Sequence, residues 1–141
     1  MECMTLRETI QSAVLQTSDT VNDEEKGGII LCKDAEYSFA LLANDNTGTD
    51  LAKVLWSANR KEYGSKVIPM IKDGWEQYAS FHTHPKFKPI PSSIDMEKLF
   101  EGFPRNYIYS PEFKTFGIYV WEGEQLKRAV ITYNALTGYG Y

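Results

Sequence analysis

The chain has 141 residues, of which 43% are apolar and 24% charged, and its formal net charge is −4. This composition supplies a core for one domain and excludes extensive disorder, and the acidic balance argues against a protein that binds a nucleic-acid backbone. Two cysteines exclude a disulfide framework and a four-cysteine zinc site, and there is neither a secretory signal nor an apolar run long enough to span a membrane. We therefore expect a single soluble, cytoplasmic domain over residues 1–141, with no nucleic-acid or membrane partner.

The first half of the sequence predicts a helix, a β-hairpin and a second helix. Residues 5–16 carry apolar side chains at helical spacing, and Thr5 with Glu8 forms a capping-box pattern at their start. The apolar run 28–32 predicts a strand buried on both faces, paired through a tight turn with a strand over 37–43. A second helix is predicted over 50–60, whereas residues 61–74 remain ambiguous.

The second half predicts strands around one further helix. The aromatic-rich stretch 75–84 favours a strand, and residues 85–91 hold three prolines, which predict a stiff, non-helical connection. A helix is expected over 93–102, and the tail 135–141 is expected to be frayed or adaptable. The remaining strands are predicted at 106–110, 116–121 and 126–133.

Several residue types that often mark sites are expected to serve the core instead. Cys32 ends an apolar strand, so we expect it to be a small buried residue. Trp56, Trp75 and Trp121 fall in helix or strand patterns and are expected to pack in the interior.

One stretch carries recognisable chemistry. It reads His-Thr-His-Pro at 82–85 and, after six residues, Ser-Ser-Ile-Asp at 92–95, and it contains both histidines of the chain. In a strand, His82 and His84 point to the same face, and imidazole and carboxylate are good zinc ligands. His82, His84 and Asp95 would supply three ligands and leave a fourth position open, which is the pattern of catalytic zinc sites.

Each part of this stretch also has a structural explanation. Ser92 and Asp95 fit an ordinary helix N-terminus, since serine is a favoured N-cap and an acid suits the first turn. The histidines taken alone would be unremarkable strand residues. These alternatives are compatible with metal binding, because Ser92 or Ser93 can cap the helix while Asp95 binds the metal.

The combined pattern resembles the signature of the JAB/MPN metalloproteases, also called JAMM proteases, which is His-x-His-Pro, six residues, then Ser-x-x-Asp. That family also has a glutamate just before a glycine and an apolar strand, and Glu25 precedes Gly27 and an apolar strand here. Thr83 stands where the family often has serine. The resemblance covers about residues 5–133 and implies an α/β fold of the cytidine-deaminase-like type, with a curved, mixed, mostly antiparallel sheet flanked by helices.

The resemblance also implies a role for each site residue. His82, His84 and Asp95 would bind Zn²⁺, Glu25 would be the general base that takes a proton from the metal-activated water, and Ser92 would donate to the developing oxyanion. Glu24 is the alternative base, although its distance from the glycines fits the family pattern less well.

The function so implied is zinc-dependent hydrolysis of a peptide or isopeptide bond by a minimal, prokaryotic-type member of the family. The substrate would be a protein or peptide, including one with a ubiquitin-like C-terminal tail. Two alternatives stay open: a toxin- or phage-associated peptidase acting on another protein, and a non-catalytic MPN-like module that binds peptides. Segment 44–74 carries none of the motifs on which the resemblance rests and is the candidate for partner selection, and the sequence leaves the oligomeric state undetermined.

Overall fold

The computed structural model describes residues 4–17, 27–42, 60–83, 103, 105–122 and 124–137. Its helices are α1 (Leu6–Thr17), α3 (Arg60–Lys66), α4 (Ile68–Lys72) and α6 (Tyr133–Thr137). Its strands are β1 (Gly27–Lys33), β2 (Glu36–Leu42), β3 (Glu76–Thr83), β4 (Arg105–Ser110), β5 (Thr115–Glu122) and β6 (Gln125–Thr132). The predicted helix over 5–16, the hairpin and the strands of the second half are all confirmed.

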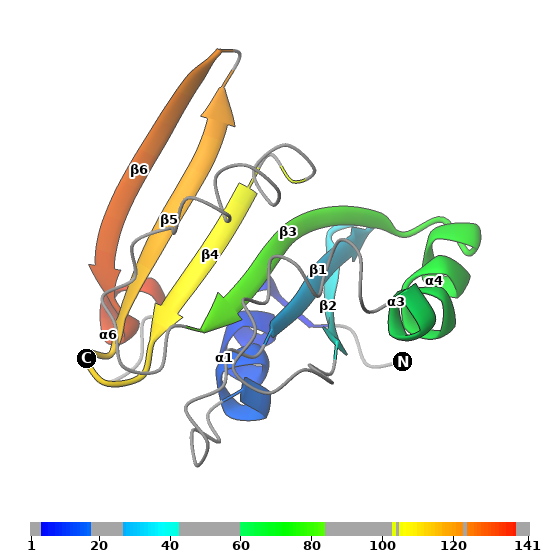
Figure 1. The fold of residues 1–141 in the computed structure, drawn as a ribbon, viewed down its shortest axis with the longest axis horizontal. Coiled ribbons are helices and arrows are strands. Elements are labelled where there is room, and N and C mark those ends of the chain that lie inside the picture. Colours follow the sequence, from blue (N-terminus) through cyan, green and yellow to red (C-terminus); the bar gives the residue numbers. More distant parts are fainter. Residues whose placement is uncertain are drawn as a thin grey trace.

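The strands form one curved, six-stranded sheet in the order β2-β1-β3-β4-β5-β6 (Figure 1). Four neighbouring pairs are antiparallel, and β3 with β4 is the parallel pair. A parallel pair needs a crossover connection, and here it is made by the segment between Thr83 and Arg105. The expected fold class, an α/β protein with a mixed, mostly antiparallel sheet flanked by helices, is confirmed.

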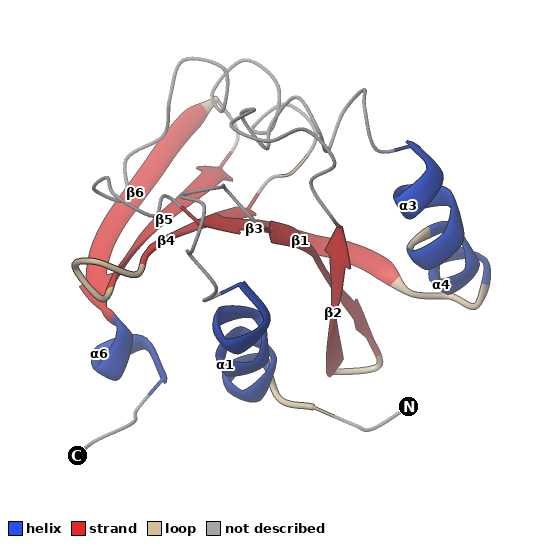
Figure 2. Ribbon diagram, turned by 60° about the horizontal axis from the view of Figure 1, so that its bottom comes forward, coloured by secondary structure: helices blue, strands red, loops and turns tan. Residues whose placement is uncertain are grey.

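One face of the sheet is covered by α1, with α6 beside it (Figure 2). The capping box forms as predicted: the backbone N–H of Glu8 donates to Thr5 Oγ1 at 3.1 Å, and the N–H of Thr5 donates to Glu8 Oε1 at 3.3 Å. The buried stripe of α1 packs against the strand residues that point to this side, and we call this side the helix face. Its fully or nearly buried members are Ile10, Ala13, Val14, Ile30, Ala79, Phe81, Tyr107, Tyr109 and Phe116.

The opposite face carries a second apolar cluster, to which α3 and α4 contribute. Residues 61–74, ambiguous in the sequence, form these two short helices, and Pro69 lies in the first turn of α4, where a missing N–H costs no hydrogen bond. Val67, between them, is fully buried against this cluster. We call this side the site face, and its strand members include Ile29, Leu31, Ile108 and Tyr119.

Two expectations about single segments were wrong. Residues 135–137 belong to α6 rather than to a frayed tail, because the N–H of Ala135 donates to Thr132 Oγ1 at 3.1 Å and Leu136 packs against the helix-face cluster. Cys32 is half-buried rather than buried, since it lies near the end of β1, beyond the buried run of that strand. The helical turn of α6 follows Thr132, whose hydroxyl accepts the N–H of Ala135, and the apolar pattern of the sequence does not reveal it.

Other expectations have mixed outcomes. Trp75 is buried at 6% exposure and Trp121 packs against the same cluster, as predicted. Trp56, the helix over 93–102 and, apart from Arg60, the helix over 50–60 lie outside the described residues. Within the described part of the chain, no helix is long and apolar enough to cross a membrane.

Candidate functional site

His82 is the residue before the last one of β3 and is fully buried. Along this strand Ala79 and Phe81 point to the helix face, so the two-residue alternation directs Ser80 and His82 to the site face. The following residue on that face would be His84, one position beyond the last residue of β3. The strand therefore presents its first candidate ligand at the edge where the crossover begins.

The strand register places the start of β1 beside this histidine. Gly27, the first residue of β1, is the direct partner of His82 in the antiparallel β1–β3 pair. On the other side His82 is paired with Ile108 of β4, which is paired with Gly117 of β5. The imidazole thus has a glycine, which carries no side chain, as its neighbour on β1.

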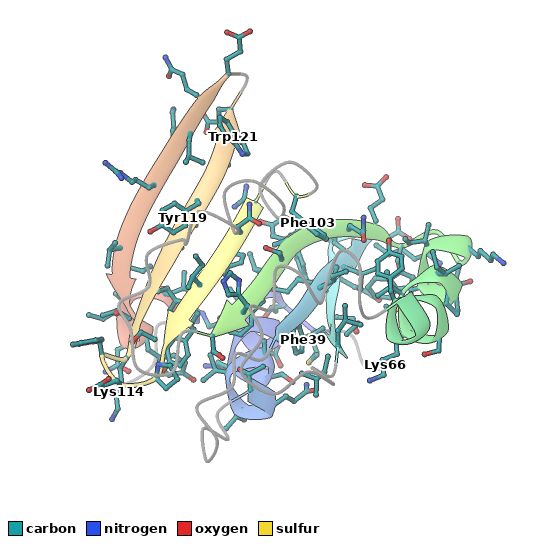
Figure 3. The ribbon with its side chains drawn as sticks, in the orientation of Figure 1. Phe39, Lys66, Phe103, Lys114, Tyr119 and Trp121 are labelled. Atoms are coloured by element: carbon teal, nitrogen blue, oxygen red, sulfur yellow. The ribbon has the colours of Figure 1, made fainter. Side chains whose placement is uncertain are left out.

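A buried polar network lies one row away on the same face. Ser80 and Asn106 are direct partners in the parallel β3–β4 pair, and both are fully buried. The hydroxyl of Ser80 donates to Asn106 Oδ1, and Asn106 Nδ2 donates to the backbone carbonyl of Phe103 at 2.8 Å. Phe103 lies beside the start of β4 (Figure 3) and packs into the site-face cluster.

Sequence reasoning missed this network. Ser80 and Asn106 are 26 positions apart, and no local pattern connects them. The available signal was the presence of an asparagine directly before the apolar run Tyr-Ile-Tyr of β4, since asparagine is depleted in strands.

Comparison with known proteins agrees with this arrangement. The family model described as prokaryotic homologs of the JAB domain matches residues 7–128. The chain belongs to the JAB-domain family. Among solved structures, the solution structure of protein DSY2949 from Desulfitobacterium hafniense matches with a TM-score of 0.57, covering 89% of this chain and 87% of that one. The two sequences are 16% identical, so this likeness supports the fold alone. No protein with a curated description matches.

Of the site residues predicted from the JAB-type motif, the structure describes His82. His84, Ser92, Asp95 and Glu25 lie outside the described residues. Within the described part, no group of three or more His, Cys, Asp or Glu side chains comes together. The described surroundings nevertheless suit a metal ligand at His82, because imidazole nitrogen is a good zinc donor and the adjacent Gly27 adds no bulk.

Cys32 does not belong to this edge of the JAB domain. It lies near the end of β1, whereas Gly27 is the first residue of that strand, and it is paired with Glu76 at the start of β3. Burial, together with the Glu76 carboxylate, raises the pKa of the Cys32 thiol. A thiol with a raised pKa is a poorer nucleophile and metal ligand at neutral pH, so Cys32 is not a candidate for the centre.

Proposed function

We propose that this JAB-domain protein is a zinc-dependent metallopeptidase that hydrolyses a peptide or isopeptide bond. In this proposal His82, His84 and Asp95 hold the metal, Glu25 is the general base, and Ser92 donates a hydrogen bond to the developing oxyanion. The substrate is a protein or peptide, and we propose the C-terminal tail of a ubiquitin-like protein as the first to test.

The pairing of Gly27 with His82 is the observation that carries this proposal. Glu25 precedes Gly27 by two residues, and two peptide units span at most about 7–8 Å. Glu25 and His82 are 57 positions apart in the chain, and the β1–β3 register, which pairs Gly27 with His82, supports the proposal that the base acts beside this histidine. The motif spacing and the family assignment support the same grouping.

The chemistry assigned to each residue follows from its type. Bound zinc would lower the pKa of a coordinated water to about 7 and polarise a carbonyl. The carboxylate of Glu25 would accept a proton from the attacking water and return it to the departing amine. The neutral hydroxyl of Ser92 donates a hydrogen bond where negative charge develops on the scissile carbonyl oxygen.

The test uses Glu25→Gln, with Glu24→Gln as a matched control one residue away. Glutamine keeps the size and polarity of glutamate but cannot accept the proton. The probe is a ubiquitin-like protein joined through its C-terminal glycine to a reporter, either as a linear fusion or through a lysine isopeptide bond. We expect kcat to fall by about 10²–10⁴-fold in Glu25→Gln, with zinc content unchanged, and to stay near wild type in Glu24→Gln.

The results separate the candidate functions. Equal turnover by wild type and Glu25→Gln would refute the role of Glu25 as the base, and loss in Glu24→Gln alone would transfer that role to Glu24. A folded, zinc-loaded wild type that binds the probe but cleaves neither linkage would favour the peptide-binding module. Cleavage of other proteins without cleavage of the ubiquitin-like probe would favour the alternative peptidase.

A further inference from the structure

We propose that Asn106 is a positioning residue for the metal centre, acting together with Ser80. Through these two side chains, the end of the segment that carries His84 and Asp95 is tied to the strand that carries His82. This inference rests on the proposed function, because it concerns the ligands named there.

The contacts form a chain from β3 to Phe103. The hydroxyl of Ser80 donates to Asn106 Oδ1, so the asparagine oxygen is held by β3. The same asparagine donates from Nδ2 to the carbonyl of Phe103 at 2.8 Å, so both halves of its amide are used. Ser80 and Asn106 are 0% exposed, which excludes water as a competitor for these hydrogen bonds.

Packing alone does not account for a buried amide at this position. In this row of the sheet, the residues that directly flank Ser80 and Asn106 on the site face are Ile29 and Tyr119, both members of the apolar cluster. A leucine, which has the same number of side-chain heavy atoms and the same branching, would avoid the cost of burying an amide. The amide instead holds one particular backbone carbonyl, that of Phe103.

The position of Phe103 in the chain gives this contact its significance. Residues 84–102 leave β3 directly after Thr83 and return to the sheet at Phe103, eight positions after Asp95. One end of this segment is fixed by its covalent bond to β3, and the other is fixed to β3 through Asn106 and Ser80. Ser80 is two residues from His82 on the same face, a separation of about 7 Å, so the anchor lies close to the first ligand.

The ligand on β3 and those carried by residues 84–102 must all reach one metal ion, each at a distance set to within a few tenths of an ångström. Residues that hydrogen-bond a metal ligand directly usually contribute about 10–100-fold to metal affinity. Asn106 acts one step further from the metal, through Ser80 and Phe103. We therefore expect Asn106→Leu, which keeps the branching of the side chain but removes both hydrogen bonds, to raise the zinc dissociation constant by about 10-fold, the lower end of that range. Ser80→Ala, which removes only the first bond, should raise it by a smaller factor.

The experiment measures the zinc dissociation constant of the full chain by competition with a chromophoric chelator. Ile10→Val serves as the control, because it weakens packing on the helix face, away from the network. Circular dichroism establishes folding of each variant, and the visible spectrum of the Co²⁺-loaded protein reports ligand geometry. We expect a weakened affinity and an altered spectrum for Asn106→Leu, and wild-type values for Ile10→Val.

A folded Asn106→Leu with a wild-type dissociation constant and Co²⁺ spectrum would overturn the inference, as would an equal loss of affinity in Ile10→Val. If Asn106→Leu does not fold, Ser80→Ala decides: a several-fold weaker affinity supports the inference, and an unchanged affinity overturns it. A wild type that binds no zinc would overturn the proposed function as well. If the wild type binds zinc and the variants bind it equally tightly, this inference alone is overturned.

Discussion

Gly28, which directly follows the glycine paired with His82, provides a sharp test of the β1–β2 pairing on the other side of β1. A Cβ atom added at Gly28 would lie 1.9 Å from the carbonyl oxygen of Ala40 and 2.9 Å from its carbonyl carbon. Because real Cβ contacts stay above about 3.0 Å, the two strands would have to separate by at least about 1.1 Å. Such a movement stretches a ladder hydrogen bond from about 2.9 Å to about 4 Å, which breaks it.

Gly28→Ala should therefore lower the free energy of unfolding by roughly 2–6 kcal/mol, because two buried backbone groups left unpaired cost about 1–3 kcal/mol each. Gly64→Ala is the matched control, since a Cβ there has nothing within 4 Å and the exposed site lies in α3. Alanine should stabilise that helix by up to about 1 kcal/mol. Urea unfolding followed by circular dichroism measures both, and a Gly28→Ala loss below about 1 kcal/mol would refute the reasoning.

Three further predictions concern the hairpin turn, a thiol and a loop. Ala35 adopts a φ of 66°, so Ala35→Gly should stabilise the protein by about 0.5–1 kcal/mol in urea unfolding, whereas Ala129→Gly, in the extended strand β6, should destabilise it. Because burial and the Glu76 carboxylate raise the pKa of the Cys32 thiol, its rate of alkylation by iodoacetamide should keep rising above the pH at which the rate of a free thiol levels off. Glu76→Gln should shift this pH profile to lower pH, and an unshifted profile would contradict the role of Glu76. Replacing residues 44–59 with a short linker should change substrate selectivity more than zinc content, and unchanged selectivity in a folded variant would remove this segment from partner choice.

The choice of 44–59 rather than 44–74 comes from the structure. Val67 is fully buried in the site-face cluster, and Tyr63 donates to Gln77 Oε1 of β3 at 2.8 Å. Replacing the whole of 44–74 would remove α3 and α4 with part of the core, so a loss of selectivity could not be separated from unfolding. Residues 60–74 therefore belong to the scaffold, and the proposed role in partner selection is confined to the preceding part.

Local signals account for what the sequence predicted well. Thr5 and Glu8 lie within one helical turn, and the strands show apolar runs or aromatic enrichment that need no distant partner to be recognised. The His-x-His spacing likewise encodes a shared strand face by itself. Such features depend on residues a few positions apart, where backbone geometry alone fixes their relation.

Long-range features were not accessible in the same way. The parallel pairing of β3 with β4, the register that sets Gly27 against His82, and the Ser80–Asn106 bond all depend on how distant segments meet. The sequence showed that Glu25 and the histidines matched one family, but not which backbone positions adjoin. The side chains of Glu25, His84, Ser92 and Asp95 remain predictions of the motif.

Zinc stoichiometry is the most direct measurement of the central claim. Elemental analysis of the purified wild type should give one zinc per chain, and His82→Ala and His84→Ala should each lose it. Ile108→Val, a neighbour of His82 in the same row of the sheet, should retain it, as should Glu25→Gln. Undiminished zinc in a folded His82→Ala or His84→Ala variant, or a folded wild type that takes up no zinc, would contradict the account.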